Sequence, residues 1–239
     1  MNLTSTKGYK IITAWLLSKG HQPFLFQQQT WQHIIDGKSG FSVFIGALID
    51  FINNNENNYQ TKNKNGLQLL WITPLRALAK DIGRAMEEVV ADLNMQWKVG
   101  IRNGDTPISE REKQKKQMPE VLIITPESLH LLLAQKNNAD IFKAVKIIAV
   151  DEWHELMGSK RGVQTELAIN RIVNAQYSIT NIQCSIWGIS ATIGNLEQAK
   201  EVLLSSLKKE GVIVKAAIKK NIEVIPVIPD EIEKYPWAG

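Results

Sequence analysis

The stretch KIIAVDEWHEL, residues 146–156, joins an apolar run to a cluster of charged side chains. The run Ile147–Val150 contains only isoleucine, alanine and valine. A short unbroken run of this kind is typical of a strand that is buried on both faces of a parallel sheet. Asp151 and Glu152 follow directly, where the chain has to leave the sheet. We therefore expect a parallel strand that ends in two adjacent carboxylates.

Short apolar runs and longer periodic segments alternate along the rest of the chain. The strand-like runs are Leu67–Ile72, Lys98–Ile101, Val121–Ile124, Val145–Val150 and Cys184–Ile189, with two last apolar runs at Val212–Val214 and Ile222–Ile228. The helix-like segments are Val43–Ile52, Leu75–Leu93, Glu127–Ala134, Gly162–Asn174 and Leu196–Leu207. The Asn-rich segment 53–66 lacks periodicity and predicts a surface loop. The alternation predicts an α/β fold with a largely parallel sheet and helices on both faces.

Composition sets broad limits on the kind of protein. The chain has 239 residues, of which 44% are hydrophobic and 22% charged, enough for one large domain or two small ones. Its net charge of +4 permits a polyanionic partner without indicating one. The single cysteine, Cys184, excludes an internal disulfide, and no Cys/His cluster forms a zinc pattern. No apolar run approaches the ~20 residues of a membrane span, so we expect a cytoplasmic protein without membrane contact.

Polar residues follow several of the apolar runs, and ligands of parallel α/β sheets bind beyond the carboxyl ends of the strands. In Asp151-Glu152, one carboxylate could hold Mg²⁺ through water while the other orients an attacking water. Equally, Asp151 could cap the next helix and Glu152 could favour its dipole. His154-Glu155 lacks the second histidine that a zinc-binding H-E-x-x-H motif requires.

Two Thr-Pro pairs and a Ser-Ala-Thr segment follow other apolar runs. Thr73-Pro74 and Thr125-Pro126 each place a capping hydroxyl and then proline at a first helical turn, where free backbone N–H groups suit phosphates. Ser190-Ala191-Thr192 also follows an apolar run and precedes a helix. Each segment alone is equally explained as an ordinary helix cap, so their common order along the chain carries the argument.

The motifs stand in a recognisable order: Gln27, TPLRAL at residues 73–78, Gly104-Asp105-Thr106, TPESL at 125–129, DEWH at 151–154 and SAT at 190–192. This set resembles the first RecA-like domain of superfamily 2 DEXH-box helicases. Within that superfamily the chain looks most like the Lhr-type group, particularly its ligase-associated branch. The specific marks are PFLFQQQTW, ITPLRALAKDI, DEWHEL followed by GSKRGVQTELAINRI, and the closing YPWAG, so the resemblance covers nearly the whole chain.

The resemblance implies a role for each matching residue. Gln27 would contact the adenine of ATP, Asp151 would organise Mg²⁺ and Glu152 would activate water. The implied catalytic set, which includes the motif that couples hydrolysis to strand movement, is Asp151, Glu152, His154, Ser190 and Thr192. The segments that track single-stranded DNA would contain Thr73, Pro74, Arg76, Gly104, Asp105, Thr125 and Pro126. Lys160 and Arg161 are either additional DNA contacts or residues of a solvated loop.

One segment departs from the family pattern. DGKSG, residues 36–40, contains Gly-Lys-Ser, but the first glycine of a G-x-x-x-x-G-K-[ST] loop would fall on Gln32. Family members continue into a buried strand and a glycine-rich loop, whereas here Phe41 follows Gly40. About a dozen residues, including the eight of the P-loop, are missing. Losing that strand would expose neighbouring strand edges. Either the given sequence omits a segment, or the chain is a deletion variant.

These observations give one principal hypothesis. Residues 1–239 would be a single RecA-like ATP-binding domain, the N-terminal fragment of an ATP-dependent, 3′-to-5′ DNA helicase of DNA repair. Its partners would be single-stranded or partly duplex DNA, a second RecA-like domain of the same full-length chain, and a repair ligase or nuclease. The alternative is a non-catalytic nucleic-acid- or partner-binding domain without a functional P-loop. A metal hydrolase that uses Asp151, Glu152 and His154 is the least favoured reading.

Overall fold

The computed structural model describes residues 2–36, 43–135, 138–180, 184–190, 193–205, 207 and 211–216. The Gly40–Phe41 junction, Thr192, the run Ile222–Ile228 and the closing YPWAG lie outside the described residues.

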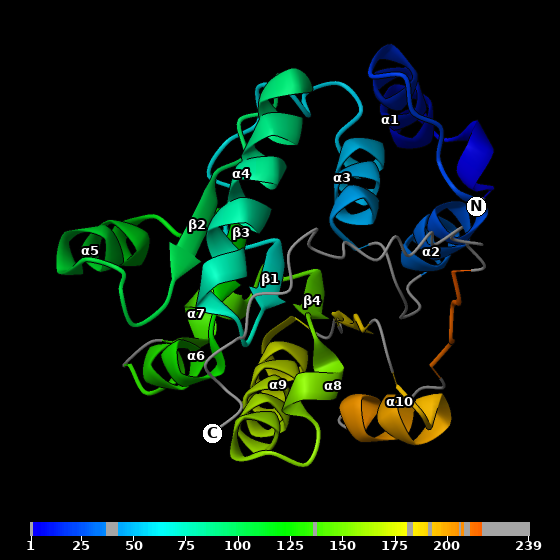
Figure 1. Cartoon of the computed structure of the whole chain (residues 1–239). Coiled ribbons are helices and arrows are strands. Elements are labelled where there is room, and N and C mark those ends of the chain that lie inside the picture. Colours follow the sequence, from blue (N-terminus) through cyan, green and yellow to red (C-terminus); the bar gives the residue numbers. More distant parts are fainter. Residues whose placement is uncertain are drawn as a thin grey trace, which may run out of the picture.

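A parallel sheet forms the centre of the molecule (Figure 1). The strands are β1 (Leu69–Ile72), β2 (Val99–Arg102), β3 (Val121–Ile124), β4 (Ile147–Val150) and β5 (Ser185–Gly188). Their order across the sheet is β2-β3-β1-β4-β5, and every pair of neighbours is parallel. The predicted α/β fold with a largely parallel sheet is confirmed.

Helices cover both faces of this sheet. One face packs against α3 (Val43–Asn54) and α4 (Arg76–Asp92), and α1 (Lys7–Ser18) and α2 (Leu25–Ile35) pack onto α3. The other face packs against α6 (Pro126–Leu133), α7 (Asn138–Phe142), α8 (Trp153–Leu156), α9 (Lys160–Thr180) and α10 (Leu196–Leu204). A short 3₁₀ helix, η1 (Leu3–Ser5), precedes α1, and α5 (Ile108–Lys116) lies beyond the β2 edge (Figure 1).

Alternation along the strands divides the apolar residues between two cores. Leu69 and Trp71 of β1 belong to the core beneath α3 and α4, whereas Leu70 and Ile72 belong to the core beneath α6 and α9. Successive side chains of a strand point to opposite faces, so a strand covered on both sides has to be apolar throughout. This is why the short runs without polar residues predicted the strands correctly.

Several elements differ from the sequence expectations. Helix α9 begins at Lys160 and ends at Thr180, so it is longer than the predicted helix 162–174. Helices α5 and α7 were not predicted, and α8 was expected only in the alternative that places a helix directly after Asp151-Glu152. The segment 212–214 forms no strand in the structure. A strand needs a neighbour to accept its backbone hydrogen bonds, and nothing described pairs with this segment.

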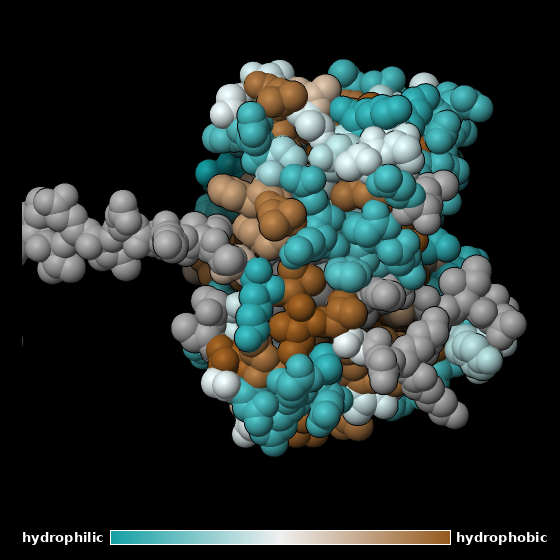
Figure 2. Space-filling model, turned by 90° about the vertical axis from the view of Figure 1, so that its right-hand side faces the viewer, coloured by the Kyte–Doolittle hydropathy of each residue, from teal (hydrophilic) through white to brown (hydrophobic). Residues whose placement is uncertain are grey.

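Strand β5 ends the sheet on the side opposite β2. Among the described strands it pairs only with β4, so no described strand lies along its other edge. Apolar side chains gather across the middle of the face that carries α2 and α10 (Figure 2). An open strand edge is what the sequence predicts for a chain without the P-loop strand. That link stays a prediction, because the junction lies outside the described residues.

Candidate functional site

The parallel strands deliver five polar segments to one edge of the sheet. Ladder hydrogen bonds continue just past the strand ends, with Thr73 N donating to Ile124 O at 3.0 Å and Asp151 N donating to Ile72 O at 2.8 Å. Ile189 N likewise donates to Val150 O at 2.8 Å, directly before Ser190. The segments predicted from sequence therefore start level with one another at the carboxyl edge, as the parallel topology requires.

Asp151 lies at this edge in a largely buried position, with 8% of its surface exposed. Its Oδ2 faces the indole N–H of Trp71 at 3.4 Å, and its Oδ1 accepts from the backbone N–H of Glu152 at 3.1 Å. Burial raises the pKa of the Asp151 carboxyl above its ordinary value, and the neighbouring charge of Glu152 adds to the rise. Two adjacent carboxylates in a largely buried position repel each other, and a bound cation would reduce this repulsion.

Glu152 has a left-handed backbone, with φ 49° and ψ 46°. A residue other than glycine in this region carries strain, and such residues cluster at functional sites. The strained turn makes Glu152 the N-cap of α8, but no side-chain capping bond forms there. The alternative in which Asp151 caps this helix is therefore wrong, because its carboxylate bonds the N–H of the next residue instead.

His154 joins the acidic pair to the segment that follows β5. Its Nδ1 lies 2.8 Å from Ser190 Oγ and 3.3 Å from Glu152 Oε2, while its Nε2 lies 3.4 Å from Glu155 Oε1. The structure thus brings together four of the predicted catalytic residues, while Thr192 lies outside the described residues. Within the described part of the chain, no group of three His, Cys, Asp or Glu side chains is placed to hold a metal ion.

The segment after β1 packs against the loop after β2. Thr73 is fully buried, and its hydroxyl accepts from Leu75 N at 3.4 Å. Arg76 Nη1 lies 3.3 Å from Asp105 Oδ1, and its guanidinium lies over Gly104, where a Cβ would come within 3.1 Å of it. Helix α4 starts at Arg76 with Leu75 as its N-cap, so the expectation that Pro74 opens this helix is wrong. The Thr73 hydroxyl forms a local turn instead.

The segment after β3 matches its expectation more closely. Thr125 is the N-cap of α6, and Pro126 occupies the first turn, as predicted. The Thr125 hydroxyl, however, donates to Ser128 Oγ at 3.2 Å and makes no backbone capping bond. The Thr125 hydroxyl therefore leaves the backbone N–H groups of this helix start uncapped, and the Glu127 carboxylate lies in the same turn and accepts from its own backbone N–H.

Sequence reasoning missed Arg111, which fixes the loop after β2. Its Nε donates to Thr106 O at 2.9 Å, and its Nη2 donates to Asn103 O at 2.9 Å and Gly104 O at 3.2 Å. Arg111 lies on α5, whose sequence ISEREKQKK has no apolar periodicity. In the sequence, the role of Arg111 is indicated only by its position five residues after Gly104-Asp105-Thr106, and such a spacing is a weak signal.

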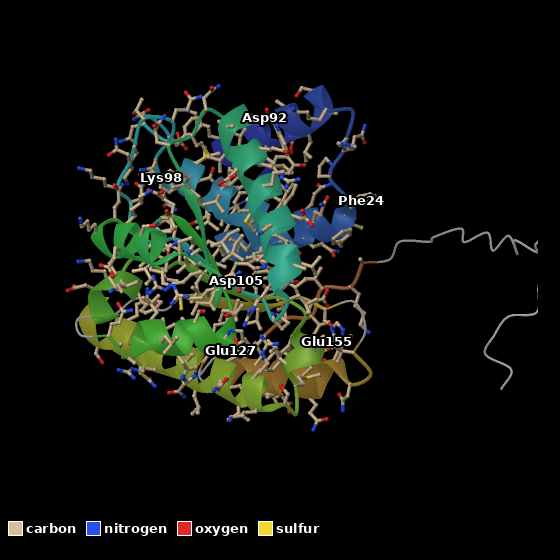
Figure 3. The ribbon with its side chains drawn as sticks, turned by 60° about the vertical axis from the view of Figure 1, so that its left-hand side comes forward. Phe24, Asp92, Lys98, Asp105, Glu127 and Glu155 are labelled. Atoms are coloured by element: carbon tan, nitrogen blue, oxygen red, sulfur yellow. The ribbon has the colours of Figure 1, made fainter. Side chains whose placement is uncertain are left out.

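Two further predicted residues, Lys160 and Arg161, start α9. Lys160 is exposed. Arg161 instead donates to the Glu127 carboxylate and to the carbonyl of Pro74, so it bonds two of the predicted DNA-tracking segments. Glu127, Asp105 and Glu155 come from separate segments, and all three are labelled at the lower side of the sheet in Figure 3.

Gln27 lies apart from these groups, in the first turn of α2. Its Oε1 accepts from the backbone N–H of Phe24 at 2.8 Å, and Phe24 stacks on Phe26 with ring centroids 5.7 Å apart. Phe24 is labelled in Figure 3, away from Glu127 and Asp105. Among the described residues, no hydrogen bond links Gln27 to the acidic pair.

The sequence that carries this site is similar to that of known helicases. A family model described as DEAD/DEAH box helicase matches residues 26–200. The Lhr helicase/uracil glycosylase of Escherichia coli is 30% identical over 202 residues, which are 75% of this chain and 13% of that protein. The ATP-dependent helicase Lhr-Core protein 2 of Thermococcus barophilus is 30% identical over 77% of this chain and 22% of its own length.

Solved structures agree with these relatives. The Mycobacterium smegmatis helicase Lhr bound to ssDNA and AMP-PNP superposes with a TM-score of 0.71 at 25% identity, over 87% of this chain and 27% of that one. The DUF1998 helicase MrfA bound to DNA and AMPPNP gives a TM-score of 0.69 at 21% identity and shows the shared fold. The chain therefore spans only a minor part of the curated and solved proteins that it matches.

Proposed function

This chain belongs to the DEAD/DEAH box helicase family, as the first RecA-like domain of an Lhr-type helicase, and on that premise we propose that it is the ATP-dependent motor domain of a DNA helicase. The observation that carries the proposal is the acidic pair at the end of β4, linked through His154 to Ser190 after β5. Nucleotide hydrolysis needs one carboxylate to hold the metal ion and one to orient the attacking water. A motor also needs a contact that transmits the change at the nucleotide site to another segment of the domain.

The acidic pair fits a hard divalent cation. Asp151 would hold Mg²⁺ and Glu152 would orient the attacking water, and burial of the Asp151 carboxylate beside a second carboxylate supports this division. Bound Mg²⁺ would neutralise developing phosphate charge. The phosphate cradle fits less well, because Gly37-Lys38-Ser39 lacks the first glycine of a P-loop. Gln27 is proposed as the adenine contact.

His154 and Ser190 are proposed to couple the nucleotide end of the site to the segment that leads into α10. The Ser190 hydroxyl lies 2.8 Å from one ring nitrogen of His154, and the same nitrogen lies 3.3 Å from Glu152. On this proposal, a change in the charge around Glu152 would act on the His154–Ser190 contact directly. Thr192 is proposed to act in the same segment.

Single-stranded DNA is proposed to cross the loops after β1, β2 and β3. Helix starts and backbone N–H groups suit phosphate oxygens, and phosphate contacts give the sequence-independent binding that a translocase needs. Arg76, whose ion pair with Asp105 is exposed on both sides, is available to a phosphate at low cost. The proposed DNA-contacting residues are Thr73, Pro74, Arg76, Gly104, Asp105, Thr125, Pro126 and Lys160.

The wider context of the motor domain is also proposed. Residues 1–239 would act with a second RecA-like domain, which would complete the hydrolysis site, and with a ligase or nuclease in cytoplasmic DNA repair. No helix in the described residues is long and apolar enough to cross a membrane.

A second candidate function follows from the departure at Gly40–Phe41. A chain without a P-loop would bind DNA or a partner protein without nucleotide chemistry. The retained Gln27, Asp151, Glu152 and Ser190 favour the motor instead, because a binding module has no need of them.

The deciding experiment measures the affinity of this chain for fluorescent oligo(dT) by anisotropy, with and without ATP and Mg²⁺. A motor domain should change its affinity when nucleotide is added, whereas an affinity indifferent to ATP and Mg²⁺ would support the binding module. The intact mass fixes the interpretation. A value of 26.9 kDa means that the gap is real, and a mass higher by roughly a kilodalton means that a P-loop segment is present.

A P-loop-intact, full-length form allows a direct test of the chemistry. Glu152→Gln should abolish DNA-stimulated ATP hydrolysis and leave ATP binding in place, since the amide keeps the shape of the side chain and loses the base. Unchanged turnover in that variant would refute the assignment of Glu152.

A further inference from the structure

Arg161 bonds two strand-end segments at once. Its Nε donates to Glu127 Oε1 at 2.6 Å and its Nη2 lies 3.3 Å from Glu127 Oε2, which is the two-pronged geometry of an arginine–carboxylate pair. The same Nη2 donates to the carbonyl of Pro74 at 3.0 Å. Pro74 follows β1, Glu127 lies in the first turn of α6 after β3, and Arg161 is the second residue of α9, which follows β4 and α8. The guanidinium therefore joins three segments that are far apart in sequence.

The backbone at Arg161 is itself held against the helix that follows the acidic pair. Ser159 Oγ donates to the carbonyl of Leu156 at 2.6 Å and accepts from Gly162 N at 3.1 Å. The hydroxyl of Thr165, which is fully buried, donates to the Arg161 carbonyl at 2.9 Å. Leu156 ends α8, and α8 starts directly after Glu152. A short chain of contacts thus runs from the acidic pair to Arg161.

The Arg161–Glu127 pair is partly exposed, with 38% and 48% of the two side chains accessible. An isolated surface ion pair of this exposure contributes little to stability. Here the pair is two-pronged, and the guanidinium also bonds a backbone carbonyl, so its main effect is to fix geometry. The three bonds use the Nε and Nη2 donors of the guanidinium, so three of its five N–H groups are engaged within the protein.

We propose that Arg161 is a positioning residue, which ties the segment at Pro74 and the first turn of α6 at Glu127 to the helix after the acidic pair and so holds both segments in the geometry that binds single-stranded DNA. The proposal rests on the proposed DNA binding by these segments. It replaces direct phosphate contact by Arg161 and leaves Lys160, its exposed neighbour, as a candidate contact.

Two substitutions separate positioning from direct contact. Arg161→Lys keeps the positive charge but cannot form the fork to Glu127 and the bond to Pro74 together. Glu127→Gln removes a negative charge from the proposed DNA-binding face. If Arg161 touches phosphate directly, Arg161→Lys should change affinity little and Glu127→Gln should strengthen binding. If Arg161 is a positioning residue, both variants should weaken binding.

The measurement is the dissociation constant for oligo(dT) as a function of salt, on the 239-residue chain. We expect each variant to bind about tenfold more weakly, which corresponds to about 1.4 kcal/mol. The double variant should bind no more weakly than either single one, and the salt slope should stay at the wild-type value because no phosphate contact is lost. Glu88→Gln, which removes the same charge from an exposed position on α4, is the matched control and should not weaken binding.

Tighter binding by Glu127→Gln, or wild-type binding by Arg161→Lys, would overturn the proposal. Lys160→Gln gives the contrasting pattern of a direct contact, a salt slope lowered by about 0.7 for single-stranded DNA. Circular dichroism and urea unfolding of each variant exclude loss of the fold as the cause.

Hydrogen exchange tests the positioning role without DNA. The amides of Thr73 and Leu129, which are hydrogen bonded to Ile124 O and Thr125 O in these two segments, should exchange faster in both Arg161→Lys and Glu127→Gln than in the wild type, with β2 unchanged. Unaltered exchange in both segments would refute the positioning role whether or not the chain binds DNA. Faster exchange together with a wild-type chain that does not bind oligo(dT) would support the tie and instead refute the proposed DNA binding.

Discussion

Replacing Gly162 with alanine should destabilise this domain, although alanine is normally the better residue inside a helix. A Cβ at this position would lie 2.0 Å from the carbonyl oxygen of Leu156 and 2.8 Å from its carbonyl carbon, both backbone atoms. Helix α9 would have to move away from the end of α8. Overpacking of this severity costs up to about 3 kcal/mol, while the helix propensity of alanine returns about 1 kcal/mol.

The net loss is therefore about 2 kcal/mol, the difference between these two effects. For a chain of 239 residues this lowers the melting temperature by roughly 4–8 °C. Urea unfolding followed by circular dichroism measures the free energy, and thermal unfolding measures the melting temperature.

Gly194→Ala is the matched control for this substitution. No heavy atom lies within 4 Å of a Cβ at Gly194, so the same change should be neutral or should stabilise by up to about 1 kcal/mol through the unfolded chain. If Gly162→Ala unfolds at or above the wild-type midpoint, α9 does not approach the Leu156 carbonyl as closely as the structure has it. The start of α9, and Arg161 with it, would then not be held against the end of α8.

Three further predictions follow from buried and paired groups. Burial raises the pKa of the Cys184 thiol to about 12, so the thiol should stay protonated and inert to Ellman's reagent at pH 8 until the protein unfolds; rapid labelling of the folded chain would contradict this. Gln176 donates to Val145 O at 2.6 Å and accepts from Cys184 N at 3.1 Å, so Gln176→Leu should lower the unfolding free energy by about 2–4 kcal/mol, whereas Ser178→Ala on the same helix should change it by less than about 0.5 kcal/mol. Burial tends to raise the pKa of the Glu127 carboxyl, but the hydrogen bond from Arg161 and smaller effects outweigh it, so the pKa is lowered from its ordinary value of 4.5. The stabilisation by the Arg161–Glu127 pair is therefore present above pH 4.5 and is lost as the pH falls through the pKa of the folded protein. In Arg161→Gln the Glu127 pKa measured by NMR should rise, and an unchanged value would show that the pair is absent in solution.

The strands were predictable from the sequence, whereas some helices were not. β1, β3 and β4 each contain only apolar residues because both faces of the sheet are covered, and burial of that kind leaves a local signal. Helix α5 leaves none, since its polar sequence is supported by the pairs Lys113–Glu110 and Lys115–Glu112 and by its position beyond β2. Its start and end therefore depend on surface interactions, which leave no periodic pattern of apolar residues in the sequence.

The candidate site was predicted in its parts, but its connections were not. Asp151 and Glu152 were located because they follow an apolar run directly, and strand ends in a parallel sheet meet at one edge. The left-handed backbone of Glu152 and the bond between His154 and Ser190 were not visible, because they depend on how neighbouring turns close.

The sequence by itself determined the parallel α/β sheet, the order of the motifs and the family, because burial on both faces and short motifs are local properties of the chain. The tertiary structure alone decided what Arg161 does. From the sequence it was a basic residue in a charged segment, equally suited to DNA or to solvent. Its partners, Glu127 and the Pro74 carbonyl, lie 34 and 87 residues away in sequence, and only the packing of α9 beside the strand ends brings them within hydrogen-bond distance.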